Sequence, residues 1–402
     1  MAFKGGNLSL QRRMRHILLL LWSLVSLILG LLSLRPAPSM FFLKLKVVVT
    51  EYGYLGSILQ GIGLLFTRKL RSRVGGGFNL FATASILAGS LCTTLPLLRA
   101  LFYAVDLSER FDTAFGDSAY EQHSRTVISL QRLFMVWPAS LRRAEKRVFS
   151  KTDDHELSLD LFRPPHPSQE GDPCIVVVHG GSWTHGSSRD FASLSPYLAA
   201  QGYVVVGINY RKADKYPFPA ARNDLRSAID YVKDNAADLG VDNDRIVLVG
   251  RSAGGQLALL VAYDQEDPAI RGVVSFYGPT DMVYGFNDPT DPRVIDTPNT
   301  LGLYLRGTPH NAREKYDAAS PINFVRQDSP RTLLLHGSHD EMVHIAQSDR
   351  LSQQLETQHV PHLYIKLPWA THGFDHNLWG PGGQISTYAV ERFLNHVLQK
   401  HQ

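Results

Sequence analysis

The sequence predicts an α/β fold, with a mainly parallel central sheet covered by helices on both faces, preceded by N-terminal transmembrane helices. From about residue 148 onward, short apolar and β-branched runs alternate with segments of helical periodicity. Such alternation is typical of a parallel sheet. Long uncharged apolar runs precede it. We therefore expect a membrane region over residues 1–105, an amphipathic linker over 106–147 and an α/β domain over 148–402.

The first predicted span covers residues 17–34, an uncharged run preceded by Arg12, Arg13 and Arg15. Its length is near that needed to cross about 30 Å of hydrocarbon. A cleaved signal peptide is the rival interpretation, but such a segment has a shorter apolar core and a small-residue cleavage site. Residues 80–98 form a second uncharged run, rich in Ala, Ser and Gly that pack helix on helix.

The segment between them decides the topology. Residues 47–66 are apolar except for Glu51, and a basic cluster from Arg68 to Arg73 follows. If this segment also crosses, both basic clusters lie on the cytoplasmic side, and the α/β domain of this multi-pass protein lies on the non-cytoplasmic side. Glu51 opposes a span because a carboxylate in hydrocarbon costs a few kcal/mol. The alternative is an interfacial segment, with the α/β domain in the cytoplasm.

Charge and cysteine content exclude several classes of function. The first 110 residues carry 13 of the 41 Lys and Arg but only 3 of the 37 Asp and Glu. Basic charge interleaved with apolar runs favours a membrane surface over nucleic acid. With only Cys92 and Cys174, the chain offers neither a disulfide framework nor a metal cluster. We therefore expect the bilayer as a partner, with no nucleic acid and no metal.

The α/β domain shows seven candidate strands and two clear helices. Several strands are continuously apolar, which indicates burial on both faces. In the linker, residues 128–137 are amphipathic and suit a membrane surface. The expected strands cover residues 157–162, 174–179, 203–208, 245–250, 272–276, 332–336 and 363–367, and the helices cover 221–235 and 255–263.

Ser252 is the candidate nucleophile. It lies in Gly250-Arg-Ser-Ala-Gly254, between a predicted strand and a predicted helix. A nucleophilic serine at such a turn needs small neighbours, because the backbone is strained and the following helix passes close by. The alternative is that this stretch is an ordinary tight turn with an incidental serine. The predicted strand before it and the predicted helix after it argue against this alternative.

His179-Gly-Gly-Ser-Trp183 follows a strand and is the candidate oxyanion loop. Acyl transfer requires donors arranged in advance around the developing negative oxygen. We expect the N–H groups of Gly181 and Ser182, together with that of Ala253, to supply them, with Gly180 as an alternative. His179 more readily holds this loop by hydrogen bonds than acts as a base.

The general base and its acid are expected late in the chain. His372 follows the last predicted strand and precedes a glycine, which favours it over His376. Asp340 lies in the loop after the penultimate strand, where it would fix the tautomer of His372. The rivals for these two roles are Glu341, Asp281 and His336, the last of which ends a strand and suits a buried structural position.

Four ordered motifs, His-Gly-Gly-Ser-Trp, Gly-Arg-Ser-Ala-Gly-Gly, His-Gly-Ser-His-Asp and His-Gly-Phe, resemble those of the α/β-hydrolase serine esterases, in the hormone-sensitive-lipase and bacterial carboxylesterase or feruloyl-esterase-like group. The resemblance covers about residues 148–402. It implies a Ser252–Asp340–His372 triad without a cofactor. Many members have a third glycine where this chain has Ser182. Isoprenylcysteine methylesterase-like members resemble the arrangement of membrane segments before an esterase domain.

The predicted activity is membrane-bound hydrolysis of carboxylic esters through an acyl-enzyme on Ser252. Residues 279–330 are the expected cap over the site, and the membrane region favours a small or lipid-like ester. Alternatives on the same fold are a peptidase, an aryl formamidase or a non-catalytic binding module. The candidates for an apolar acyl wall are Tyr284, Phe286, Leu303 and Tyr304.

Overall fold

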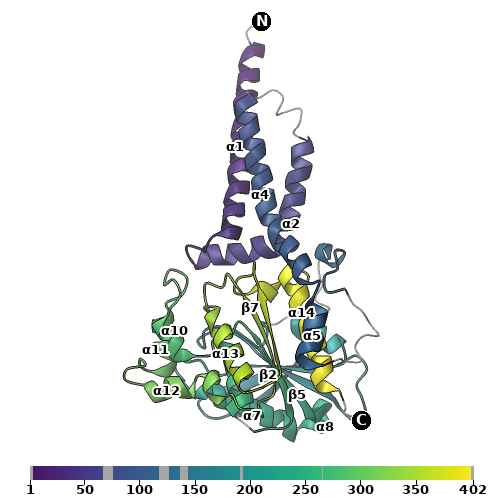
Figure 1. Ribbon diagram of the computed structural model, residues 1–402, viewed down its shortest axis with the longest axis vertical. Coiled ribbons are helices and arrows are strands. Elements are labelled where there is room, and N and C mark those ends of the chain that lie inside the picture. The colour runs from purple at the N-terminus through teal and green to yellow at the C-terminus, as the bar shows by residue number, and fades with distance from the viewer. Residues whose placement is uncertain are drawn as a thin grey trace.

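Three long N-terminal helices stand on one end of an α/β domain (Figure 1). The computed structural model describes residues 3–66, 76–116, 126–135, 144–190, 193–264 and 266–399. We call residues 144–399 the α/β domain. The basic cluster Arg68–Arg73 and Trp137, both used in the sequence interpretation, lie outside the described residues.

The α/β domain is built on an eight-stranded sheet in the order β1-β2-β4-β3-β5-β6-β7-β8. β2 pairs antiparallel with both β1 and β4, and the remaining neighbours are parallel. This confirms the predicted mainly parallel sheet. The strands are β1 (Glu145–Lys151), β2 (Glu156–Phe162), β3 (Asp172–Val178), β4 (Val204–Ile208), β5 (Val241–Arg251), β6 (Ile270–Phe276), β7 (Arg331–Gly337) and β8 (His362–Leu367).

β1 is the strand that the sequence did not predict. It is an edge strand, and none of its residues is fully buried. Its sequence, Glu-Lys-Arg-Val-Phe-Ser-Lys, is therefore charged rather than apolar. Charged edge strands are common because they discourage pairing with other chains.

Helices cover both faces of the sheet, which explains the apolar strands. In β3, Val176 and Val178 belong to one buried cluster and Ile175 and Val177 to the other. The first face is covered by α7 (Ala220–Asp234), α9 (Ala253–Asp264) and α13 (Ala346–Thr357), with α8 (Ala236–Leu239) at its margin. The second is covered by α5 (Leu107–Phe115), α6 (Leu194–Ala200) and α14 (Pro381–Leu398).

Part of the predicted linker belongs to this packing. α5 buries Leu107 and Phe111 in the second cluster, and Asp112 pairs with Arg392 of α14. Residues 126–135 follow, with a short 3-10 turn, η2 (Arg132–Phe134). Since α5 completes the cover over one face of the sheet, it packs as part of the same fold although it precedes residue 144.

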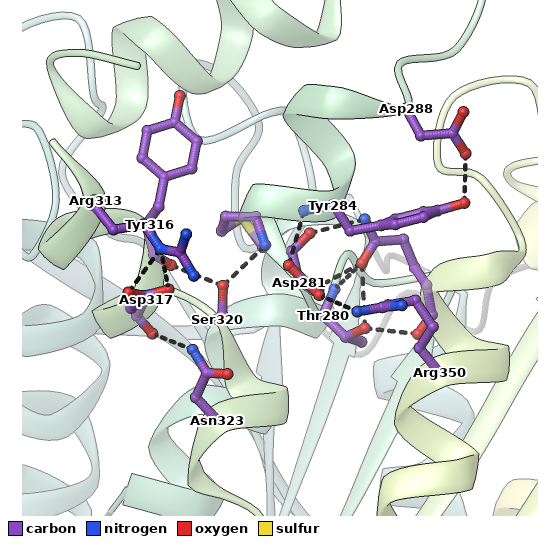
Figure 2. A network of polar contacts seen from close by, with 12 residues as sticks. Thr280, Asp281, Tyr284, Asp288, Arg313, Tyr316, Asp317, Ser320, Asn323 and Arg350 are labelled. Carbon is purple, nitrogen blue, oxygen red and sulfur yellow. Dashed lines mark hydrogen bonds and ion pairs between the residues drawn. The ribbon is translucent and has the colours of Figure 1, made fainter. Parts of the chain in front are cut away.

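An insertion between β6 and β7 lies over the carboxyl ends of the strands. It contains α10 (Met282–Asn287), α11 (Thr297–Leu305), α12 (Arg313–Ala318) and the turn η3 (Pro321–Phe324). Figure 2 shows the polar network at its base. The Gln347 side chain of α13 accepts the N–H groups of Thr280 and Asp281, both at 2.8 Å. Asp281 caps α10 and pairs with Arg350 at 2.8 Å, so the insertion is fixed to α13.

The N-terminal helices are α1 (Phe3–Leu34), α2 (Met40–Phe66) and α4 (Gly76–Tyr103). They pack through small residues: a Cβ on Gly89 would lie 2.2 Å from the carbonyl oxygen of Ser26. Residues His16–Leu34 and Gly77–Tyr103 are long and apolar enough to cross a membrane. Among the helices of the described chain, α2 does not meet this criterion, although the sequence placed a third candidate span at 47–66.

α2 has two parts with different surroundings. Figure 1 shows its first turns lying across the α/β domain and its later turns rising beside α1 and α4. In the first part, Lys46 pairs with Glu341 at 2.5 Å, and Glu51 accepts the N–H of Gly382 at 3.0 Å. Gly382 lies in the first turn of α14, where backbone N–H groups favour a carboxylate. Glu51, the residue that opposes a membrane span, therefore makes a polar contact with the α/β domain.

The Lys46–Glu341 pair offers a test of this attachment. The Lys46 side chain is 1% exposed, and that of Glu341 is 13% exposed. Removing one partner of a buried pair leaves an uncompensated charge, which costs about 3 kcal/mol or more. We expect Lys46→Met to lower the free energy of unfolding in detergent by about this amount, measured by urea denaturation.

The matched control is Lys44→Met, because Lys44 lies on the exposed side of the same helix. The double variant Lys46→Met/Glu341→Leu should recover most of the lost stability, since it removes both charges. A cost for Lys46→Met no larger than that for Lys44→Met would contradict a stabilising role for the pair.

Candidate active site

Ser252 lies at the sharp turn between β5, which ends at Arg251, and α9, which begins at Ala253. Its φ is +55°, a left-handed conformation that is uncommon for residues other than glycine. The turn is held by the Ser252 N–H, which donates to the Phe276 carbonyl at 2.9 Å. A Cβ on Gly254 would lie 2.2 Å from the Val178 carbonyl oxygen, so only glycine lets α9 approach β3 this closely.

The loop after β3 lies against this turn. A Cβ on Gly180 would come within 2.9 Å of the Arg251 carbonyl oxygen and 3.2 Å of the Ser252 Cβ. Gly181, Ser182 and Trp183 follow with φ values of +113°, +50° and +60°. Three consecutive left-handed residues turn the chain sharply beside the serine, within the loop that the sequence analysis singled out as the oxyanion loop. Ser182, Ser252 and Ala253 line one cavity.

His179 is buried beneath this loop. Its Nδ1 lies 2.6 Å from the Gly180 carbonyl oxygen and its Nε2 lies 2.8 Å from the Lys212 ammonium, so Nδ1 donates and Nε2 accepts. Its ring stacks on Tyr210 with centroids 4.2 Å apart. Burial and the positive charge of Lys212 lower the pKa of His179 to about 4. A neutral His179 therefore holds the loop in place by hydrogen bonds, as its position in the motif indicated.

His372 and Asp340 are brought together from two loops. The His372 Nδ1 lies 2.7 Å from Asp340 Oδ2, and the backbone N–H groups of Met342 and Val343 donate to Asp340 Oδ1 at 2.8 and 2.9 Å. The Nε2 of His336 lies 3.2 Å from Asp340 Oδ2. Burial alone would raise the pKa of Asp340, but the charge of His372 and the hydrogen bonds from His336 and His372 hold it below its usual value.

The rival candidates have other partners. Glu341 points to Lys46, and Asp281 caps α10 and pairs with Arg350. His376 lines a separate groove with Arg189 and Asp190. His336 is fully buried at the end of β7, where its Nδ1 lies 2.7 Å from the Ser348 hydroxyl. Its contact with Asp340 was not expected from the sequence.

A second network connects the serine turn with the His372 loop. The Arg251 guanidinium pairs with Asp375, and the Tyr277 hydroxyl donates to the same carboxylate at 2.5 Å. The Tyr277 ring lies 4.2 Å from that of His372, centroid to centroid. The carbonyl of Phe276 accepts the Ser252 N–H, and the next residue, Tyr277, contacts His372. The end of β6 therefore contacts both the serine turn and the histidine loop. Proximity of Arg251 to Ser252 was the only sequence signal for this network.

The cavity beside Ser252 extends under the insertion. Its apolar wall is formed by Trp183, Met282, Ile295, Leu301, Met342 and Val343. The four residues considered from the sequence, Tyr284, Phe286, Leu303 and Tyr304, are not among its lining residues. Tyr304 instead stacks behind the wall on Trp183, with ring centroids 4.2 Å apart. The four predicted residues lie in α10 and α11, which do contribute Met282 and Leu301 to the wall. Their own side chains point away from the cavity, because neighbouring residues of a helix face different directions.

Comparison with known proteins gives the family. A model of the BD-FAE family matches residues 159–355. Esterase LipC of Mycobacterium tuberculosis is 30% identical over 303 residues, which cover 68% of this chain and 73% of LipC. The chain belongs to the α/β-hydrolase carboxylesterases. The probable carboxylic ester hydrolase LipM of the same organism is 32% identical over 258 residues, which cover 60% of this chain and 58% of LipM. The match thus spans little more than half of LipM.

Solved structures show the same esterase fold. Est2 from Thermogutta terrifontis is 25% identical with a TM-score of 0.53, and the match covers 63% of this chain and 92% of Est2. A truncated carbohydrate esterase from gut microbiota matches at 24% identity with a TM-score of 0.53, covering 63% of this chain and 98% of that one. Within the described residues of this chain, no group of three His, Cys, Asp or Glu side chains is placed to hold a metal ion.

The lowered pKa of His179 predicts that the stability of the folded chain depends on pH. Because its pKa falls from 6.5 to about 4 on folding, the unfolded chain binds a proton in this pH range that the folded chain does not. Stability must therefore fall as the pH drops through the range, by about 2 kcal/mol between about pH 7.5 and 5.

The variant His179→Gln removes this titration while it keeps a donor for Gly180 and an acceptor for Lys212. We expect its free energy of unfolding to depend less on pH than that of the wild type, measured by denaturation at both pH values. Equal losses of stability in the two proteins would show that His179 does not titrate in this way.

Proposed function

We propose that the protein is a membrane-bound serine carboxylesterase in which Ser252 is the nucleophile, His372 the general base and Asp340 the orienting acid. The observation that carries this proposal is the 2.7 Å contact of His372 Nδ1 with Asp340, next to a cavity lined by Ser252 and Ala253. The family to which the chain belongs supports the same assignment.

In the proposed reaction, the Ser252 hydroxyl oxygen attacks the ester carbonyl carbon while His372 Nε2 accepts its proton. The negative oxygen of the tetrahedral intermediate is stabilised by the N–H groups of Gly181, Ser182 and Ala253. His372 then gives the proton to the leaving alkoxide, which departs as an alcohol and leaves an acyl-enzyme. Water, deprotonated by His372, attacks the acyl-enzyme and releases the carboxylic acid and the free serine.

The left-handed residues of the oxyanion loop support this assignment of donors. Gly181 lies where a Cβ would be 2.3 Å from the His185 carbonyl oxygen, so no other residue fits there without movement. Ser182 adopts φ +50° despite its side chain, and it lines the cavity where many relatives would have glycine. We infer that its hydroxyl narrows the acyl site near the reacting carbon.

The substrate we propose is a lipid-like ester, and the esterase domain is proposed to lie on the non-cytoplasmic side of the membrane. The largely apolar cavity wall suits an acyl chain. The two candidate spans, His16–Leu34 and Gly77–Tyr103, support attachment to a bilayer. The basic residues before the first span support a cytoplasmic N-terminus. The outside position also requires α2 as a third crossing, and its later turns do rise beside α1 and α4 (Figure 1).

The direct test is replacement of the nucleophile. We expect Ser252→Ala to lower the turnover of p-nitrophenyl acetate by about 10⁴-fold or more, because the covalent route is lost. Labelling by a fluorophosphonate should disappear with it, while circular dichroism and thermal unfolding remain as in the wild type.

Ser168→Ala, at an exposed loop away from the cavity, is the control and should keep full activity and labelling. Unchanged turnover in Ser252→Ala would contradict the proposal and favour a non-catalytic binding module. Matched amide and dipeptide substrates belong in the same assay, because faster cleavage of these than of the ester would indicate an aryl formamidase or a peptidase.

A further inference from the structure

The outer wall of the cavity lies directly beneath the connection between α1 and α2. Ala37 and Leu43 form a small buried apolar cluster with Val294 of the insertion, and Met40 and Met342 pack against it. Met342 also lines the cavity beside Ser252. One layer of side chains therefore separates the cavity from the N-terminal helices. We call the contact of Ala37, Met40 and Leu43 with Val294 and Met342 the seam.

The part of α2 next to the seam has a mainly apolar outer face, on which Lys44 is also exposed. Phe41 is 71% exposed, Val48 is 51% exposed and Tyr52 is 39% exposed. The opposite face, with Lys46 and Glu51, is buried against the α/β domain. A helix with apolar residues on one face and polar anchors on the other suits the plane of a membrane interface. Figure 1 shows this part lying across the domain at the foot of the upright helices.

The two sides of the seam differ in how firmly they are held. Near the catalytic acid loop, Glu341 accepts the N–H of Ala37 at 3.1 Å and pairs with Lys46. On the insertion side, Val294 shares a purely apolar cluster with Ala37 and Leu43. Contacts of this kind are non-directional, so a hydrocarbon chain can replace them without leaving polar groups unpaired. The polar contacts of Glu341 can therefore keep Asp340 in place while the apolar contacts around Val294 separate.

We propose that the seam is the route by which the acyl chain of a bilayer-resident ester enters the cavity, passing sideways from the membrane interface between Leu43 and Val294. This inference rests on the proposed esterase function and specifies its substrate class as esters with long apolar chains held in a lipid bilayer. Water-soluble short-chain esters do not need this route, because Ser252 is partly exposed to solvent.

The test closes the seam covalently. The variant Leu43→Cys/Val294→Cys, made in a Cys92→Ala background, is joined by oxidation or a short bis-maleimide, and mass spectrometry measures the joined fraction. We expect hydrolysis of a long-chain ester in phosphatidylcholine vesicles to fall about tenfold or more in the joined protein. The rate on p-nitrophenyl acetate in the same sample should remain close to that of the unjoined protein.

Each single-cysteine variant, treated with the same reagent, is the control and should keep both activities. A second variant, Val294→Ala, thins the seam and should raise the vesicle rate relative to the acetate rate. An unchanged ratio of the two rates in both the joined protein and Val294→Ala would overturn the inference. Turnover of acetate without any hydrolysis of the vesicle ester by the wild type would overturn it as well, while leaving the proposed esterase activity intact.

Discussion

The buried carboxylate of Asp340 is the constraint on which the rest of the site depends. It receives two backbone N–H groups from its own loop and faces two imidazoles, those of His372 and His336. Only an ionised carboxylate accepts from all of these groups, and together they hold its pKa low despite burial. His336, whose Nε2 also lies 3.0 Å from the Val343 carbonyl oxygen, contacts the same carboxylate oxygen as His372, whereas the other oxygen accepts the two backbone N–H groups. The orientation of His372, the proposed general base, therefore follows from the packing at the end of β7.

The same short loop joins the chemistry to the N-terminal helices. Asp340 holds the histidine, Glu341 pairs with Lys46 of α2, and Met342 separates the cavity from the α1–α2 connection. Three consecutive side chains thus contact the proposed general base His372, Lys46 of α2 and the cavity beside Ser252. A displacement of the first part of α2 would therefore move Glu341 and Met342, and with them the position of Asp340 and the shape of the cavity. The helical region is for this reason a structural part of the active-site surroundings.

The sequence predicted what local rules determine. Continuous β-branched runs predicted the central strands, because both of their faces are buried, and the glycines around Ser252 predicted a turn where α9 passes close to β3. The charged edge strand β1 was missed since its residues face solvent. The Arg251–Asp375–Tyr277 network joins residues up to 124 positions apart, and no local pattern specifies such a contact. The cavity wall was misassigned for a related reason: which side of α10 and α11 faces the serine depends on how Gln347 fixes the insertion to α13.

The most direct measurement of the central claim is the ester turnover of Asp340→Asn. This substitution keeps the shape of the side chain but places an amide where His372 Nδ1 must donate, so the histidine is held in the wrong tautomer. We expect kcat to fall about 10⁴-fold near pH 7 with the fold preserved, whereas Asp349→Asn, at an exposed ion pair with Lys366, should retain the wild-type rate. Near wild-type turnover in Asp340→Asn would contradict the account, because the base would then be oriented without this carboxylate.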